Sequence, residues 1–214
     1  MRFRDREEAA RLLAERLASY KGESPLVLGI PRGAVPMART IADLLDGEMD
    51  VVLVHKLRAP DQPELAIGSV DETGQTYLGR YAFGLDEETI AAEKAAQMDV
   101  LKRRRARYTP AHPPVDPAGR VVIVVDDGIA TGASMIAALR AVRTAGPKKL
   151  IAATAVAPRE SLQAIEDLAD EVVCLQVPDD FYAVGEYFIE FDQVSDDEVV
   201  ALLRQSRSGT KSKT

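Results

Sequence analysis

The stretch VVIVVDDGIATGAS, residues 121–134, places five apolar side chains before two adjacent acids and a run of small residues. A short valine-rich run of this kind predicts a buried strand. In a parallel sheet, ligands bind beyond the carboxyl ends of the strands, and Asp126 and Asp127 fall at such an end. The two acids are therefore predicted to meet a ligand.

The loop after the two acids is suited to binding an anion. Its small side chains leave main-chain amides uncovered, two hydroxyl groups add donors, and a helix predicted for 131–144 points its positive end at the loop. The acids would repel that anion at contact, so they must address a cation or a neutral hydroxylated part of the same molecule. A sugar phosphate has both parts. The loop residues are Gly128, Ala130, Thr131, Gly132, Ala133 and Ser134.

This pattern resembles the type I phosphoribosyltransferases, which bind 5-phosphoribosyl-1-pyrophosphate. In that family the two acids hold the ribose 2′ and 3′ hydroxyls, and the loop holds the 5′-phosphate. The resemblance implies that Asp126 and Asp127 bind the diol and that residues 130–134 bind the phosphate. It covers about residues 25–176 and is strongest at 121–134.

Other interpretations of the same stretch fit less well. VVDD also resembles the opening strand of receiver domains, which place it near their start, whereas here it lies past the middle of the chain. A Walker A loop and a dinucleotide fingerprint need motifs that this sequence lacks. A purely structural pair of aspartates at a strand end stays open as an alternative.

The segment GIPRGAVP, residues 29–36, occupies the place of the family's pyrophosphate loop, which follows the first core strand and often has unusual peptide geometry. Pro31 fixes the turn, Arg32 offers a charged fork to phosphate oxygens, and Gly33 allows close approach of the backbone. Taken alone, Pro-Arg-Gly is an ordinary turn, and its position before a helix favours a site.

Two cations follow the second core strand. Lys56 and Arg58 precede the segment that corresponds to the family's mobile loop, about residues 56–81, and they suit the charge that develops on a leaving pyrophosphate. Both side chains could instead be solvated. We expect Arg32, Lys56 and Arg58 to act in catalysis.

Residues 177–193 correspond to the C-terminal hood that covers the acceptor base in this family. Phe181 and Tyr182 lie in the hood, where an aromatic ring could stack on the acceptor. They could equally belong to the core of the hood. The sequence shows no lysine before the hood of the kind that 6-oxopurine enzymes use, so the acceptor stays open.

The order of apolar runs and helical segments predicts an α/β fold with a mostly parallel central sheet flanked by helices. The resemblance implies that this is the Rossmann-like fold of the type I phosphoribosyltransferases. One domain is expected over residues 1–205, with a disordered tail at 206–214. Strands are predicted at 24–30, 49–56, 121–126, 149–157 and 171–177, with a small hairpin ending the loop at 56–81. Helices are predicted at 4–20, 34–45, 86–105, 131–144 and 160–168, with a proline-rich loop at 109–119 and a last helix after the Ser195–Glu198 capping box.

Composition excludes several other classes. The net charge of −7 opposes nucleic-acid binding, and the basic run at 101–108 is expected to be a solvated helix face. A lone cysteine, Cys174, expected to be buried, forms no disulfide, and no zinc-ligand spacing exists. No membrane span or signal peptide is recognised, so a cytoplasmic protein is expected. The absence of Asn and Trp leans toward a thermophilic source, although genomic base composition would have the same effect.

The expected function is transfer of ribose 5-phosphate from phosphoribosyl pyrophosphate to a nitrogen acceptor, a purine or pyrimidine base, with release of pyrophosphate in nucleotide salvage. Mg²⁺ is expected to be bound mainly through the substrate, with no metal site of the protein's own. The alternatives are a regulatory protein that binds phosphoribosyl pyrophosphate without turnover, and transfer to water or another non-base acceptor. Dimers are common in the family, so a homodimer stays open, as does the role of Arg103 to Arg105.

Overall fold

The computed structural model of the protein describes residues 2–60 and 62–209. Its larger sheet consists of β1 (Leu26–Gly29), β2 (Glu48–Val51), β6 (Val121–Asp126), β7 (Lys149–Val156) and β8 (Glu171–Gln176). All neighbouring strands are parallel, in the order β2-β1-β6-β7-β8. The α/β class and the mostly parallel sheet expected from the sequence are therefore confirmed.

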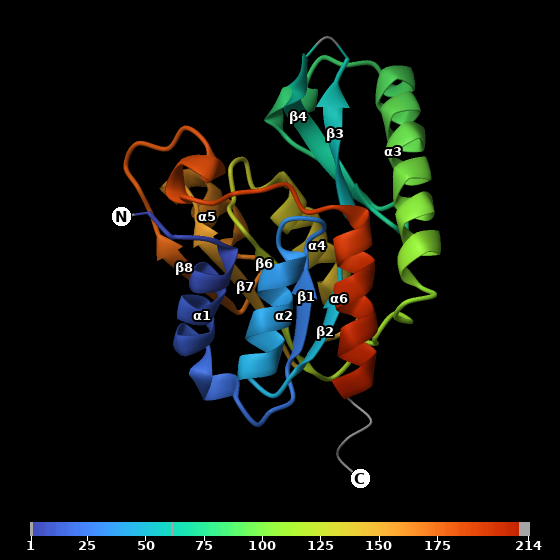
Figure 1. Ribbon diagram of the computed structural model, residues 1–214. Coiled ribbons are helices and arrows are strands. Elements are labelled where there is room, and N and C mark those ends of the chain that lie inside the picture. Colours follow the sequence, from blue (N-terminus) through green and yellow to red (C-terminus); the bar gives the residue numbers. More distant parts are fainter. Residues whose placement is uncertain (1, 61, 210–214) are drawn as a thin grey trace.

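Helices cover both faces of this sheet (Figure 1). One face carries α1 (Arg6–Arg16), α2 (Val35–Leu44) and α6 (Asp196–Gly209), and the other carries α4 (Ala133–Thr144) and α5 (Arg159–Glu166). Helix α2 packs on β1 and β2, and α4 packs on β6 and β7. No helix in the described ranges is long and apolar enough to cross a membrane.

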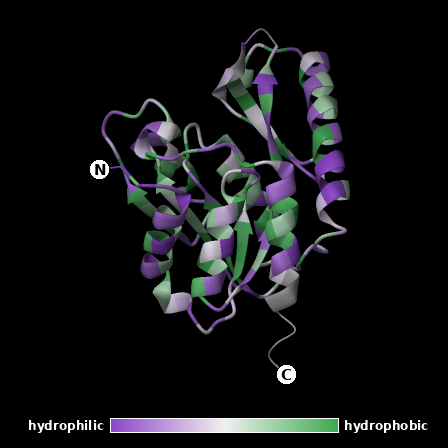
Figure 2. Ribbon diagram, in the orientation of Figure 1, coloured by the Kyte–Doolittle hydropathy of each residue, from purple (hydrophilic) through white to green (hydrophobic). Residues whose placement is uncertain are grey.

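The strand β6 lies at the centre of the core. Its side chains alternate between two hydrophobic clusters: Val121, Ile123 and Val125 pack with α1 and α2, and Val122 and Val124 pack with α4. In Figure 2 the core strands are mainly hydrophobic, whereas hydrophobic and hydrophilic residues alternate along the helices. Full burial of each valine contributes roughly 1.5–3 kcal/mol, so the strand that ends at the two acids is firmly held.

The apolar run at 49–56 was predicted as one strand, and this is wrong. It forms the end of β2 and the start of β3 (Val54–Ala59), which belong to different sheets. The break follows Asp50, a buried carboxylate that accepts hydrogen bonds from the amides of Val51 and Val115 at 2.8 Å each. Because the run stays apolar through the break, its hydropathy gives no sign of the change of sheet.

The chain leaves the core at β3 and forms a three-stranded antiparallel sheet with β4 (Gln62–Asp71) and β5 (Thr76–Leu78), which we call the flap. The sequence predicted a loop and a small hairpin here, so the flap is more regular than expected. The turn between β4 and β5 is held by the Asp71 carboxylate, which accepts from the amides of Thr73 and Gln75. Helix α3 (Glu87–Tyr108), which begins at the predicted cap Asp86, runs beside the flap.

The basic run at the end of α3 joins neighbouring elements. Arg105 forms a two-pronged contact with Glu72 of the segment after β4, and Arg107 pairs with Asp197 of α6. These side chains are partly exposed, in agreement with a solvated face, and they also tie α3 to the rest of the fold. The charge pattern alone could not have shown these partners.

The predicted capping box of the last helix is present. The Ser195 hydroxyl accepts from the Glu198 amide, and the Glu198 carboxylate accepts from the Ser195 amide. Helix α6 continues to Gly209, so the start of the predicted tail at 206–214 is helical, and residues 210–214 lie outside the described residues.

Candidate ligand-binding site

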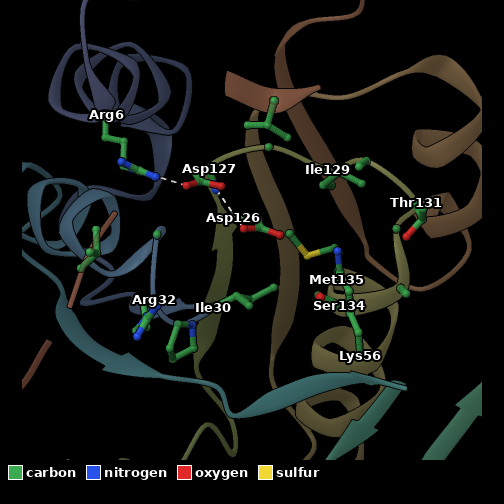
Figure 3. Close-up of a pocket in the computed structure, with 18 of the residues that line it drawn as sticks. Arg6, Ile30, Arg32, Lys56, Asp126, Asp127, Ile129, Thr131, Ser134 and Met135 are labelled. Atoms are coloured by element: carbon green, nitrogen blue, oxygen red, sulfur yellow. Dashed lines mark hydrogen bonds and ion pairs between the residues drawn. The ribbon is translucent and has the colours of Figure 1, made fainter. Parts of the chain in front are cut away.

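A cavity of about 450 Å³ opens at the carboxyl ends of β1 and β6. Its walls come from five segments that are far apart in sequence: the start of α1, the turn after β1, strand β3, the loop after β6 and the hood (Figure 3). The predicted site residues that line it are Pro31, Arg32, Gly33, Lys56, Asp126, Asp127, Gly128, Ala130, Thr131, Gly132, Ala133 and Ser134. The structure thus brings together the three motifs that the sequence singled out.

Three predicted residues lie outside the cavity walls. Arg58 was expected beside Lys56, but the β3–β4 register shifts at Arg58, which breaks the alternation that would place both on one face. Phe181 stacks on Tyr187, with ring centroids 5.8 Å apart, and Tyr182 is 82% exposed to solvent. These two hood side chains therefore do not form the wall that stacking on an acceptor would need.

The two acids are close neighbours at the end of β6. The Asp127 amide donates to Asp126 Oδ1 at 3.0 Å, and Arg6 Nε donates to Asp127 Oδ2 at 2.9 Å (Figure 3). Burial, and next the charge of Asp127, raise the pKa of Asp126 well above its ordinary value. Burial also raises the pKa of Asp127, against the opposing effect of the Arg6 charge. The chain thus holds two carboxylates in a place that disfavours their charge.

The loop after the acids ends in an open helix terminus. Gly132 is the N-cap residue of α4 and has a φ of +80°, a conformation that favours glycine. Because glycine has no side chain, it accepts no hydrogen bond from the amides of the first helical turn. The loop is anchored from outside the cavity, because Ile129 N donates to Val156 O and Ser161 Oγ donates to Ala130 O. Uncovered amides at a helix N-terminus can receive an anionic oxygen.

The turn after β1 packs against the acids. Its Pro31–Arg32 peptide bond is cis, and the Ile30 amide donates to Val125 O of β6. A Cβ atom at Gly33 would lie 2.2 Å from Asp127 Oδ2, so only glycine fits at this approach. The Arg32 guanidinium lines the cavity and lies 3.7 Å from the carboxylate of Asp196.

Several lining residues were not predicted. Arg6 reaches the cavity from α1, and Val184, Phe191 and Gln193 reach it from the hood. Arg6 stands in a helix with other exposed arginines, such as Arg11, and nothing in the sequence distinguishes it. Its role follows only from the folding of α1 against the end of β6.

The cavity contains few donors for a metal ion. No group of three or more His, Cys, Asp or Glu side chains that could hold a metal occurs in residues 2–60 and 62–209. Cys174 is half-buried in β8, and its thiol donates to Gln176 O. The side chains of the site therefore do not fit a resident metal, although Mg²⁺ could arrive with a phosphorylated ligand.

Comparison with known proteins agrees with this geometry. Residues 5–191 match the phosphoribosyl transferase domain family. The chain belongs to this family. Over 204 residues the transferase domain is 42% identical to a protein of Mycobacterium tuberculosis, strain H37Rv, provisionally named phosphoribosyl transferase Rv0571c. The match covers 94% of this chain and 46% of the relative, so the chain spans about half the length of that protein.

Two solved structures resemble the transferase domain over most of its length. TT1426 from Thermus thermophilus is 47% identical, with a TM-score of 0.82, over 96% of this chain and 99% of that chain. AQ2163 from Aquifex aeolicus is 16% identical, with a TM-score of 0.51, over 84% and 76%, which shows a shared fold alone. The family and fold inferred from residues 121–134 are thus confirmed.

Proposed function

We propose that the chain transfers ribose 5-phosphate from phosphoribosyl pyrophosphate to a nitrogen of a purine or pyrimidine base and releases pyrophosphate, as in nucleotide salvage. One observation supports this most strongly. A single cavity holds a pair of carboxylates, a loop of uncovered amides and two cations, which match the diol, the 5′-phosphate and the pyrophosphate of one ligand.

The sugar phosphate would be held by residues at the end of β6. The carboxylates of Asp126 and Asp127 accept hydrogen bonds from the 2′ and 3′ hydroxyls. The amides of residues 130–134 and the hydroxyls of Thr131 and Ser134 donate to the 5′-phosphate, and the positive end of α4 adds to this attraction. This assignment keeps the ligand phosphate away from the two negative charges.

The leaving group would lie near Arg32 and Lys56, which both line the cavity. In the reaction a bond forms between the acceptor nitrogen and the anomeric carbon, and the bond from that carbon to the pyrophosphate oxygen breaks. The acceptor's proton passes to solvent water. Arg32 and Lys56 stabilise the charge on the departing pyrophosphate, and Mg²⁺ bound to the pyrophosphate would neutralise part of it. Arg58 reaches this charge only if the flap moves.

The acceptor would enter between the loop and the hood. The hood wall at this place is formed by Val184 and Phe191, and a Cβ at Gly128 would lie 2.3 Å from Val184 Cγ1. Phe191 stacks on Phe188 with centroids 4.8 Å apart. The Phe191 ring already contacts Phe188 and the Arg6 guanidinium, so stacking of an acceptor on Phe191, Phe181 or Tyr182 would require the hood to shift.

A second candidate function is binding of phosphoribosyl pyrophosphate without turnover, in a regulatory protein. The placement of Arg58 outside the cavity favours it, because a sensor needs the ligand groups but not every cation of the reaction. The retained pair Arg32 and Lys56 favours the enzyme. Transfer to water or another non-base acceptor is a third candidate, which the same assay tests.

The test is release of pyrophosphate from phosphoribosyl pyrophosphate and Mg²⁺, with each member of a panel of purine and pyrimidine bases and without any base. We expect release with one class of base, and its loss in Asp126→Ala and Asp127→Ala. Release that does not depend on a base would indicate hydrolysis. Tight binding of the ligand without release across the panel would contradict the enzyme and support the sensor.

A further inference from the structure

Arg6 connects three parts of the cavity. Its Nε donates to Asp127 Oδ2 at 2.9 Å, its Nη1 donates to the Asp192 carbonyl at 2.8 Å, and its guanidinium lies 3.8 Å from the centre of the Phe191 ring. The ion pair is mostly buried, since the side chains of Arg6 and Asp127 are 13% and 14% exposed. A cation that is held by three groups at once has a fixed position.

The chain on either side of Arg6 also binds the hood. Phe3 exchanges main-chain hydrogen bonds with Tyr187 and Ile189, and the Arg4 carbonyl accepts from the Glu190 amide at 2.8 Å. The Phe3 ring packs on Phe188, with centroids 5.4 Å apart. The N-terminal segment and the hood are therefore one packed unit, and Arg6 is the side chain that joins it to the acids.

Asp127 is confined by this arrangement. Its Oδ2 atom lies between Arg6 and the backbone of Gly33, where no side chain would fit. Each carboxylate oxygen has more than one lone pair, and Oδ1 is not used by Arg6. The main-chain amides of Gly128 and Asp127 also act on this carboxylate, so its orientation is held from more than one side.

The charges around Asp127 make this contact important. The groups that act on the acid pair are Asp126 on β6, Arg6 on α1 and Lys56 on β3, and Arg32 lines the same cavity from the turn after β1. Two ionised acids side by side repel each other and any phosphorylated ligand. Arg6 offsets one of them without occupying the side of the cavity where the phosphate loop lies (Figure 3).

We propose that Arg6 is a positioning residue for ligand binding: it orients the Asp127 carboxylate for a ribose hydroxyl and links the hood to that carboxylate. The proposal deepens the proposed function and rests on it for the identity of the ligand. The N-terminal segment, residues 2–6, then contributes to ligand binding because it places Arg6 beside Asp127.

The test uses Arg6→Ala and Arg6→Lys, with Arg11→Ala as the matched control, because Arg11 lies on the same helix and pairs with the exposed Glu7. The first measurement is the Asp127 carboxyl titration by carbon NMR in each protein without ligand. The second is calorimetric binding of phosphoribosyl pyrophosphate with Mg²⁺ from pH 5 to 8.

We expect Arg6→Ala to raise the pKa of Asp127 and to weaken ligand binding by about tenfold or more at neutral pH, since a charge-assisted hydrogen bond is lost. The acidic limit of binding should move to higher pH. Arg6→Lys should restore part of both effects, and Arg11→Ala should change neither. A purely structural role of Arg6 would lower stability without moving the titration.

Three results would overturn the proposal. An unchanged Asp127 titration in Arg6→Ala would show that Arg6 does not control the carboxylate. Tighter ligand binding by Arg6→Ala would show that Arg6 competes with the ribose hydroxyl for the Asp127 carboxylate. A shifted titration with unchanged affinity would remove the link to binding. If the unmodified protein binds no phosphoribosyl pyrophosphate, the proposed function fails, and the titration still reports the Arg6–Asp127 contact separately.

Discussion

Asp126 and Asp127 end the central strand of the protein in a place that disfavours their charges. Burial raises the pKa of both carboxyl groups, and the charge of Asp127 raises the pKa of Asp126 further. The fold would be more stable with neutral side chains at these two positions. Binding sites commonly contain residues that reduce stability in this way. The pair is thus better explained by ligand binding than by stability.

Asp126→Asn should therefore increase the free energy of unfolding and reduce the affinity for the ligand. The pKa of Asp126 is raised above the ordinary value of 3.8, so the folded chain holds this proton more tightly than the unfolded chain does. The contribution of the Asp126 carboxyl group to the free energy of unfolding therefore falls as the pH rises from about 4 through the raised pKa. Urea unfolding of both proteins from pH 4 to pH 8 should show a difference that grows with pH in favour of Asn.

The same variant should lose about tenfold or more in affinity for phosphoribosyl pyrophosphate, because a neutral amide replaces a charged acceptor. If Asp126→Asn were less stable than the unmodified protein at pH 8, the proposal that Asp126 is an unfavourable buried charge would be contradicted.

Gly33→Ala tests the close approach of the turn to the acids. The added Cβ would lie 2.2 Å from Asp127 Oδ2, and the carboxylate is held there by Arg6, so it must leave its position. We expect ligand affinity to fall by about tenfold, measured by calorimetry. Gly79→Ala is the control, since its Cβ would meet Ile67 O at an ordinary 3.6 Å. Equal affinities of the two variants would show that Asp127 can move without cost.

At the residue scale, the sequence predicted what lies within one continuous motif. The acids and the loop to Ser134 are neighbours in the chain, so their chemistry could be interpreted together. Arg6 is distant in sequence and resembles other surface arginines. Arg58 does not line the cavity, and the register shift next to it in β3 cannot be seen in the alternation of residue types.

At the scale of elements, α1 matters because its first turn carries Arg6. Asp5 caps this helix, accepting from the Glu8 amide at 2.8 Å. Asp5→Ala should reduce the free energy of unfolding by about 1 kcal/mol and should also weaken ligand binding, because the turn that holds Arg6 loosens. Chemical unfolding and calorimetry measure the two effects.

The control for Asp5→Ala is Asp86→Ala, which removes the cap of α3. No residue of α3 lines the cavity, so this variant should lower stability and leave ligand affinity unchanged. If both variants weaken binding equally, the effect belongs to overall stability and not to the position of Arg6.

The predicted elements were most accurate where hydropathy and caps agree. The core strands other than the run at 49–56, and the helix starts at Asp86 and Ser195, were placed correctly. The flap was underestimated, because the regularity of its strands depends on their pairing with one another along residues 54–78. The change of sheet after β2 lies beside the buried Asp50, which accepts from the amide of the distant Val115, a contact that no local pattern contains.

At the scale of the whole molecule, the cavity joins the flap to the core. Lys56 comes from β3 of the flap, whereas Arg32 and the acids come from the core sheet. A ligand that contacts both should restrict the flap, as expected of a mobile loop. Hydrogen exchange of peptides from 54–78 should slow when phosphoribosyl pyrophosphate and Mg²⁺ are added, and a peptide from β7 serves as the control. Protection of the loop at 128–134 without any change in the flap would contradict this.

The overall fold could be predicted because strands buried on both faces and alternating with helices admit few arrangements. The packing of the N-terminal segment on the hood could not be predicted, since it joins residues 3–4 with 187–190 through main-chain hydrogen bonds that any sequence could form. The shape of the cavity depends on that packing.

The most direct test of the central claim is a crystal structure with phosphoribosyl pyrophosphate and Mg²⁺ bound. We predict that the ribose hydroxyls lie within hydrogen-bond distance of Asp126 and Asp127, with the 5′-phosphate on the amides of residues 130–134. A ligand bound elsewhere, or with its phosphate beside the acids and its hydroxyls on the loop, would contradict the account.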